Sequence, residues 1–143
     1  MYACAISRMM MKAISALLLK ATAVLLLAAA VNSCGNSLAS NPQDIVFPDS
    51  AVSYSKQVRP FLGLACAYSG CHGDDLPAAG IRLTSYSSFY ESPGLILAGK
   101  PDQSRLILII EEKLPHSYSF QDRIYASQKR GMKTWVTEGA KDN

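Results

Sequence analysis

Two cysteines and a histidine lie close together in the segment CAYSGCHG, residues 66–73. Cys66 and Cys71 are separated by four residues, and His72 follows the second cysteine directly. Thiols and imidazole can bind a metal ion, two thiols can form a disulfide, and two thiols followed by a histidine can attach a haem. Because the usual haem-attachment signature has two residues between the cysteines, the wider gap leaves these three kinds of chemistry open.

The start of the chain has the features of an export signal. Ala21–Val31 is an uncharged run that is apolar except for Thr22, and the first three cations of the chain precede it. The run has the length of a signal-peptide core and is too short to span a bilayer alone. The letters VNSC that end at Cys34 resemble a bacterial lipobox, in which a peptidase cuts before a lipid-modified cysteine. We therefore predict a lipoprotein signal peptide over residues 1–33 and lipidation of Cys34.

Three alternatives for this leader stay open. An uncleaved anchor would have to bury Lys20, which is costly in a membrane. Cys34 could be an ordinary residue behind a normal cleavage site. The protein could also begin at Met11 rather than Met1, which would leave Cys4 outside it.

The charge of the chain is concentrated in its leader. The formal net charge is +3, but from Cys34 onward 11 Lys and Arg balance 11 Asp and Glu. A neutral mature domain gives no general argument for binding nucleic acid or an anionic membrane surface. Export places Cys66 and Cys71 in an oxidising compartment, where free thiols are rare, so the pair needs a common explanation.

The mature chain divides into a linker and one small domain. Residues 34–51 are rich in Asn, Ser and Pro and have no period that could bury a face, which predicts a flexible tether. Residues 52–143 form the domain, and their patterns predict short helices separated by long loops. The expected helices are one capped by Ser53, kinked at Pro60 and leading to Cys66; one begun by Thr84 or Ser85; a buried one within SRLILIIEE; and an amphipathic one from Asp122 to about Glu138, closed by Gly139.

Zinc and a disulfide are the two haem-free alternatives for the cysteine segment. A structural zinc site needs four ligands, and only Cys66, Cys71, His72 and the distant His116 are available in the mature chain. Adjacent Cys71 and His72 rarely point at one tetrahedral ion. A simple Cys66–Cys71 disulfide, with His72 incidental, is the plainer alternative.

Five segments, taken in order, carry a family resemblance. They are VRPFLGLACAYSGCHG, AAGIRLTSYSSF, LAGKPDQSRLILII, KLPHSYSF and GMKTWVTEGAKDN. Together they resemble the cytochrome c-like domains of exported bacterial proteins, over nearly all of residues 52–143. The resemblance implies a mainly α fold, a small helical domain with long loops around one haem. It also implies one covalent haem c, attached through Cys66 and Cys71, with His72 bound to the iron.

The second iron ligand is where this chain departs from the family. Many members have a methionine before a proline in the loop ahead of the last helix, but here Leu114 holds that place, and leucine cannot bind iron. His116, two residues on, is our choice for the opposite face of the haem. Met132 shares a helical stripe with Trp135 and is better explained as core packing, and an open position is the third possibility. Trp135 is expected to anchor the last helix against the first.

The resemblance implies electron transfer by a lipid-anchored, periplasmic, single-haem cytochrome. Its partners would be a redox protein of the periplasm and, through the lipid, a bacterial membrane. Arg82 or Arg105 would pair with the haem propionates, and the alternative for either residue is a plain surface charge. We find no catalytic constellation and expect no enzyme activity. The alternatives are a haem-free structural or interaction lipoprotein with a Cys66–Cys71 disulfide, and a gas- or ligand-sensing haem domain.

Overall fold

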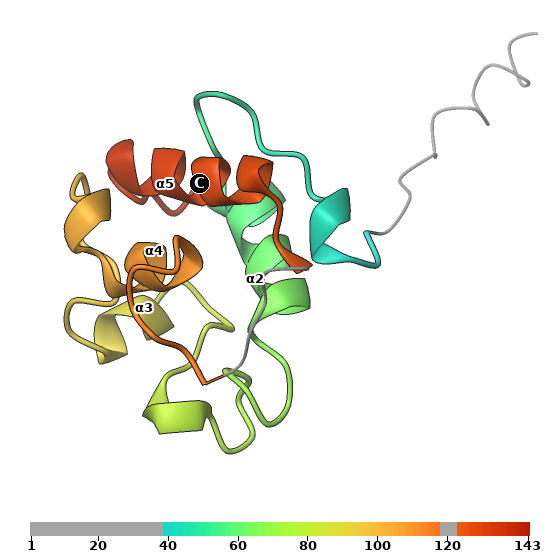
Figure 1. Cartoon of the computed structure of the whole chain (residues 1–143), viewed down its shortest axis with the longest axis vertical. Coiled ribbons are helices and arrows are strands. Elements are labelled where there is room, and N and C mark those ends of the chain that lie inside the picture. Colours follow the sequence, from blue (N-terminus) through green and yellow to red (C-terminus); the bar gives the residue numbers. More distant parts are fainter. Residues whose placement is uncertain (1–38, 118–122) are drawn as a thin grey trace, which may run out of the picture. The chain divides into compact units, whose positions relative to one another are not determined.

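The computed structural model describes residues 39–117 and 123–143. Ala39–Asn143 forms one compact unit. Within the described ranges the unit is helical and has no strand, which confirms the predicted mainly α class. Its α-helices are α2 (Arg59–Ala65), α3 (Ser88–Glu91), α4 (Arg105–Ile110) and α5 (Ala126–Thr137), shown in Figure 1.

The helix that leads to the cysteines begins as predicted at Ser53, whose side chain accepts a hydrogen bond from the amide of Lys56 at 3.3 Å. Its first part, Tyr54–Val58, is a π-helical turn, and α2 continues from it. Pro60 lies where the π-helical turn passes into the α-helix. The helix is irregular at this point because proline has no N–H to donate to the carbonyl four residues earlier. The helix ends where the amide of Cys66 donates to the carbonyl of Leu62 at 2.8 Å.

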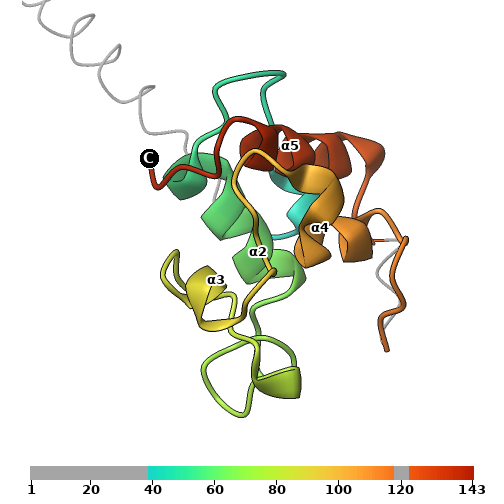
Figure 2. The ribbon, with the colours of Figure 1, turned by 90° about the vertical axis from the view of Figure 1, so that its left-hand side faces the viewer.

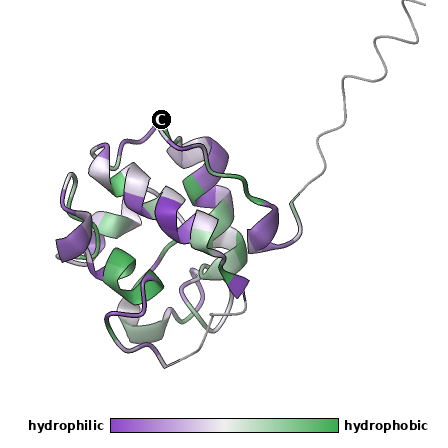
Figure 3. Cartoon of the chain, turned by 45° about the horizontal axis from the view of Figure 1, so that its top comes forward, coloured by the Kyte–Doolittle hydropathy of each residue, from purple (hydrophilic) through white to green (hydrophobic). Residues whose placement is uncertain are grey.

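Helices α4 and α5 differ in how hydrophobic their residues are. Helix α4 consists almost entirely of hydrophobic residues and α5 mixes hydrophilic with hydrophobic ones, as Figure 3 shows. The predicted buried helix within SRLILIIEE is therefore confirmed as α4. Helix α5 begins at Ala126, later than the predicted Asp122, and Asp122 lies outside the described residues. Gly139 follows its end with φ +103°, a conformation that favours glycine.

The hydrophobic core lies between these helices and holds the aromatic side chains together. Trp135 on α5 stacks on Tyr54, with ring centroids 5.9 Å apart, and lies 5.7 Å from Phe89 of α3. Its indole N–H donates to the carbonyl of Lys141 at 3.0 Å. Trp135 thus packs the last helix against the start of the first. Other apolar side chains that are fully buried are those of Val52, Val58, Phe61, Leu62, Ile107, Ile110, Met132 and Val136.

The segment ahead of the first helix packs onto this core. Ile45 is only 7% exposed, and Phe47 meets Phe61 edge-on with ring centroids 5.5 Å apart. The side-chain amide of Gln128 on α5 donates to the carbonyls of Gln43 and Ile45 at 3.3 and 3.1 Å.

These contacts place the start of the domain earlier than the sequence suggested. The expected flexible tether covered residues 34–51, whereas the compact unit begins at Ala39. Ile45 and Phe47 are the two apolar side chains that attach this segment to the helices. The sequence did not indicate this role because most of the residues around them are polar. Residues 34–38 lie outside the described residues.

The cysteine-containing loop lies at the end of the domain away from α5. Figures 1 and 2 show α5 at one end, α2 and α4 in the middle, and the loop that follows Cys66 at the other end. No helix in the described ranges has the length and apolar character that would let it cross a membrane.

Candidate functional site

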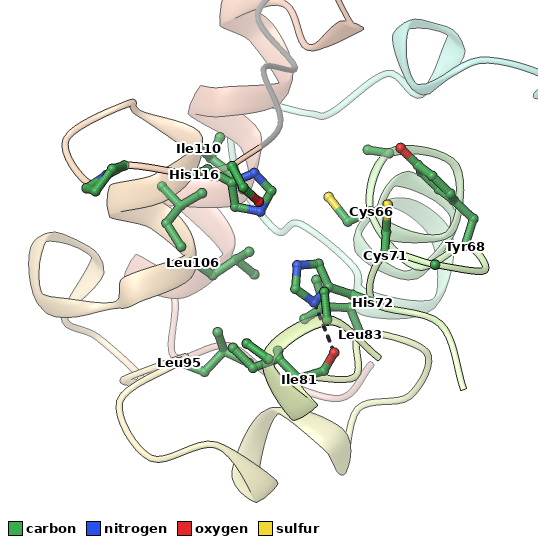
Figure 4. Close-up of a pocket in the computed structure, with 17 residues that line it drawn as sticks. Cys66, Tyr68, Cys71, His72, Ile81, Leu83, Leu95, Leu106, Ile110 and His116 are labelled. Atoms are coloured by element: carbon green, nitrogen blue, oxygen red, sulfur yellow. Dashed lines mark hydrogen bonds between the residues drawn. The ribbon is translucent and has the colours of Figure 1, made fainter. Parts of the chain in front are cut away.

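A pocket of about 550 Å³ lies between the cysteine loop, the end of α2 and α4 (Figure 4). This volume falls in the range of about 300–1,000 Å³ that is typical of cofactor and small-molecule sites. Apolar side chains make up most of the wall, and the polar groups gather at the cysteine loop and beyond the end of α4. The apolar lining residues are Ala65, Ala78, Ala79, Ile81, Leu83, Leu95, Leu106, Ile109, Ile110 and Pro115.

A tight turn accommodates the four residues between the cysteines. The amide of Cys71 donates to the carbonyl of Tyr68 at 3.0 Å, and Gly70 within the turn has φ +79°. The amide of His72 donates back to the carbonyl of Cys66 at 3.0 Å. Both cysteines therefore line the same pocket, and Figure 4 shows their sulfur atoms on one side of it. The wide spacing is compatible with two thiols serving one ligand.

Gly73 lies where the chain returns closely on this turn. Its amide donates to the carbonyl of Tyr68 at 3.2 Å. A Cβ at position 73 would lie 3.0 Å from both the carbonyl carbon and the carbonyl oxygen of Tyr68. The glycine after the histidine thus has a steric reason, which is the approach of two backbone segments.

The ring of His72 is oriented by a backbone carbonyl. Its Nδ1 lies 3.0 Å from the carbonyl oxygen of Ile81, drawn as a dashed line in Figure 4. A carbonyl oxygen can only accept, so Nδ1 carries the proton and donates. The other ring nitrogen, Nε2, is then the unprotonated one and suits a metal ion. The loop is fixed in the same place by the amide of Leu83, which donates to the carbonyl of His72 at 2.9 Å.

His116 lines the pocket from the side opposite the cysteine loop. Its ring centroid lies 5.9 Å from that of His72, and the two ring planes are inclined by 51°. An imidazole nitrogen binds a metal at about 2 Å, so this separation can accommodate one ion between the two rings. His116 is exposed at the pocket mouth, whereas His72 is half-buried.

The turn after α4 carries His116 to the pocket. Glu112 adopts the left-handed conformation, with φ +62°, and ends the helix. The amides of Lys113 and Leu114 both donate to the carbonyl of Leu108, at 2.8 and 3.2 Å, and reverse the chain. Glu112 also forms an ion pair with Lys129 of α5. Backbone and charge contacts together thus fix the start of the loop that bears His116.

Both cysteines are free, partly buried thiols. Burial, aided by the neighbouring Cys71 and opposed by the positive charge of Arg123, raises the pKa of Cys66 to about 12. Cys66 is therefore a neutral thiol at any physiological pH.

Other residues singled out from the sequence do not line the pocket. Met132 is completely buried in the hydrophobic core and does not line the pocket. Arg82 forms an ion pair with Glu91 at 3.5 Å, and Arg105 is exposed at the start of α4. Cys34, the predicted lipidation site, lies outside the described residues.

Sequence reasoning missed a contact at the edge of the pocket. The guanidinium of Arg123 donates to the hydroxyl of Tyr68 at 3.2 Å and lies 5.7 Å from the centroid of its ring. The two residues are 55 positions apart, so no local pattern could have paired them. The carbonyl of Ile81, which orients His72, was missed because every residue supplies a carbonyl.

The described residues contain no group of three His, Cys, Asp or Glu side chains that could hold a metal ion by themselves. This gives the zinc alternative no support. A haem requires less of the protein, because the porphyrin supplies four iron ligands and the chain adds only one or two. The pocket offers two thiols for attachment and two imidazoles as iron ligands, one of them oriented by a hydrogen bond. Its walls are apolar. This combination of groups fits a haem.

Comparison with known families agrees with this fit. Residues 69–117 match the model of the family described as Planctomycete cytochrome C. The matching segment contains Cys71, His72 and His116, and begins after Cys66. The match supports a cytochrome c-like domain and a haem-binding protein of cytochrome type. No curated protein and no solved structure matches the chain.

Proposed function

We propose that this chain is a single-haem c-type cytochrome that transfers electrons. One observation carries the proposal: Cys66, Cys71, His72 and His116 line one apolar pocket, and the two imidazole rings lie 5.9 Å apart. When bound, a haem supplies one-electron redox chemistry at its iron, and the protein holds, orients and shields it.

Cys66 and Cys71 would form the covalent attachment. Each thiol would add across one porphyrin vinyl group, so that one C–S bond forms and the thiol hydrogen moves to the vinyl carbon. This addition needs no oxidant or reductant. The turn between the cysteines, closed by the carbonyl of Tyr68, supports the proposal because it presents both thiols to the same pocket.

His72 and His116 would bind the iron from the two faces of the haem. The hydrogen bond from Nδ1 of His72 to Ile81 leaves Nε2 for the metal. A nitrogen ligand in place of methionine lowers the reduction potential, so we expect a carrier of lower potential than a His/Met cytochrome. Apolar walls, among them Leu83 and Leu106, would keep water from the pocket.

The exposure of His116 favours a second candidate function. A ligand that sits at the mouth of the pocket on a loop can leave more easily than one held in the core. The domain would then bind a small gas or another ligand at the vacated position. Carbon monoxide binding by the reduced protein distinguishes this function from pure electron transfer.

The wider setting is also a proposal. We place the protein in the periplasm, anchored through a lipid on Cys34, exchanging electrons with a redox protein of the periplasm and catalysing no reaction of its own. The balanced charge from Cys34 onward supports a partner other than nucleic acid.

The test is to express the full chain in an exporting host with cytochrome c maturation machinery and to measure its intact mass and reduced visible spectrum. A mass increased by one haem and sharp low-spin bands are expected. Cys71→Ser should prevent covalent attachment at that residue, and His72→Ala should remove the low-spin spectrum. A chain lighter by two hydrogens and without visible bands would instead establish the disulfide alternative.

The distal ligand needs its own pair of variants. His116→Ala should convert the reduced spectrum from low-spin to high-spin and speed carbon monoxide binding. Met132→Leu, a substitution of similar volume in the core, is the matched control and should leave the spectrum unchanged. The reverse result, with Met132→Leu altering the spectrum and His116→Ala not, would assign the ligand to Met132.

A further inference from the structure

Tyr68 and Arg123 form a contact that none of the proposed haem-binding roles uses. Tyr68 lies in the spacer between the two cysteines, and Arg123 lies just ahead of α5. The guanidinium donates to the phenol oxygen at 3.2 Å and lies 5.7 Å from the ring centroid. The ring therefore offers Arg123 both a hydrogen-bond acceptor and an aromatic face.

This contact is at the edge of the pocket. Tyr68 is itself a lining residue, and Figure 4 shows it beside Cys66 and Cys71. Arg123 is half-buried, and its charge acts on the thiol of Cys66. A guanidinium stays protonated at every pH the protein meets, so the charge is fixed. The site thus has a permanent positive charge on the side where the haem would be attached.

We propose that the spacer between the cysteines uses Tyr68 to hold Arg123 beside the pocket, and that the charge of Arg123 raises the reduction potential of the haem. This inference rests on the proposed function. Reduction adds one electron, taken from a one-electron donor, and so lowers the positive charge of the site. A neighbouring cation in a poorly solvated place stabilises the reduced state relative to the oxidised one. Arg123 would thereby offset part of the low potential that two histidine ligands impose.

The test is an optical redox titration of the haem-loaded full chain and its variants. Arg123→Gln should lower the midpoint potential, and Arg123→Lys should keep most of the wild-type value because it keeps the charge. Tyr68→Phe should give a smaller decrease, since it removes the acceptor and leaves the ring. Arg130→Gln is the matched control, because Arg130 is an exposed arginine of α5, at the end of the domain away from the cysteine loop, and does not line the pocket.

The possible outcomes separate this inference from the function on which it rests. A wild-type chain that carries no haem by mass and spectrum overturns both. A wild-type haem protein whose potential is the same in Arg123→Gln as in Arg130→Gln overturns the inference alone. If Arg123→Gln does not accumulate in folded form, Tyr68→Phe and Arg123→Lys decide, and a potential unchanged in Tyr68→Phe contradicts the role of the spacer.

Discussion

At the scale of single residues, the site depends on backbone contacts as much as on side chains. The types and spacing of Cys66, Cys71 and His72 are visible in the sequence but left a haem, a metal ion and a disulfide open, and the resemblance carried by five segments was needed to favour a haem. The carbonyl of Ile81, which selects the tautomer of His72, has no sequence signal, because any residue supplies a carbonyl.

Gly73→Ala tests the close approach in the cysteine turn. The added methyl group would meet the backbone of Tyr68 at 3.0 Å, which cannot move aside as a flexible side chain could. We expect a loss of about 1–3 kcal/mol in the free energy of unfolding, measured with denaturant. Gly63→Ala is the control, because no atom lies within 4 Å of a Cβ at that position of α2. Equal stability of the two variants would contradict the steric account.

At the scale of elements, local patterns predicted the helices better than they predicted how the helices meet. The run LILII predicted α4. Ser53 predicted the start of the first helix, and Pro60 predicted its irregularity. The packing of Phe47 against Gly131 of α5 could not be predicted, because it joins residues more than eighty positions apart.

Gly131→Ala tests this packing. A Cβ at position 131 would overlap Cβ and Cγ of Phe47, so the aromatic side chain and its segment would have to shift. Alanine favours a helix over glycine by about 1 kcal/mol. We nevertheless expect net destabilisation, because overpacking costs about 1–3 kcal/mol and displaces the segment as well. Thermal unfolding measures this loss of stability. Gly131→Ala should destabilise a chain that already carries Phe47→Ala by less than it destabilises the wild type.

The end of α4 carries a cluster of charges that should make stability depend on pH. Lys113 lies 2.6 Å from the carboxylate of Glu111, and Lys133 of α5 lies 3.0 Å from it. The hydrogen bond from Lys113, aided by Lys133 and opposed by burial, lowers the pKa of Glu111. A depressed carboxyl pKa stabilises the fold above the ordinary value of 4.5, and this contribution is lost as the pH falls through the lower folded-state value.

Denaturant unfolding of wild type and Glu111→Gln across that acid range checks the prediction. The two stabilities should differ most at neutral pH and converge in acid. A constant difference at every pH would show that the carboxylate charge of Glu111 contributes nothing.

At the scale of the whole molecule, the domain begins before the first helix. Residues 39–51 pack on the helices, so this part of the predicted tether belongs to the domain. The leader and the lipid site lie outside the described residues, and the sequence alone supports them.

Cys34→Ser separates anchoring from cofactor binding. If Cys34 carries the lipid, the variant should move from the membrane fraction to the soluble fraction after export and keep the spectrum of the wild type. Fractionation followed by intact-mass measurement tests this. A variant that stays with the membrane would favour the uncleaved anchor, because the apolar run of the leader would then hold the protein.

The difference in sequence distance between the two histidines has a consequence for folding order. The contacts around His72 are local, because its turn closes within residues 66–73 and the Ile81 carbonyl is nine positions away. His116 is more than forty positions from His72 and needs α4 and its closing turn in place. Short loops close with less loss of entropy than long ones, so the attachment side can organise in a chain that is still mostly unfolded. The haem would then be held on one face first, and the completion of the second face would report that the rest of the domain has folded.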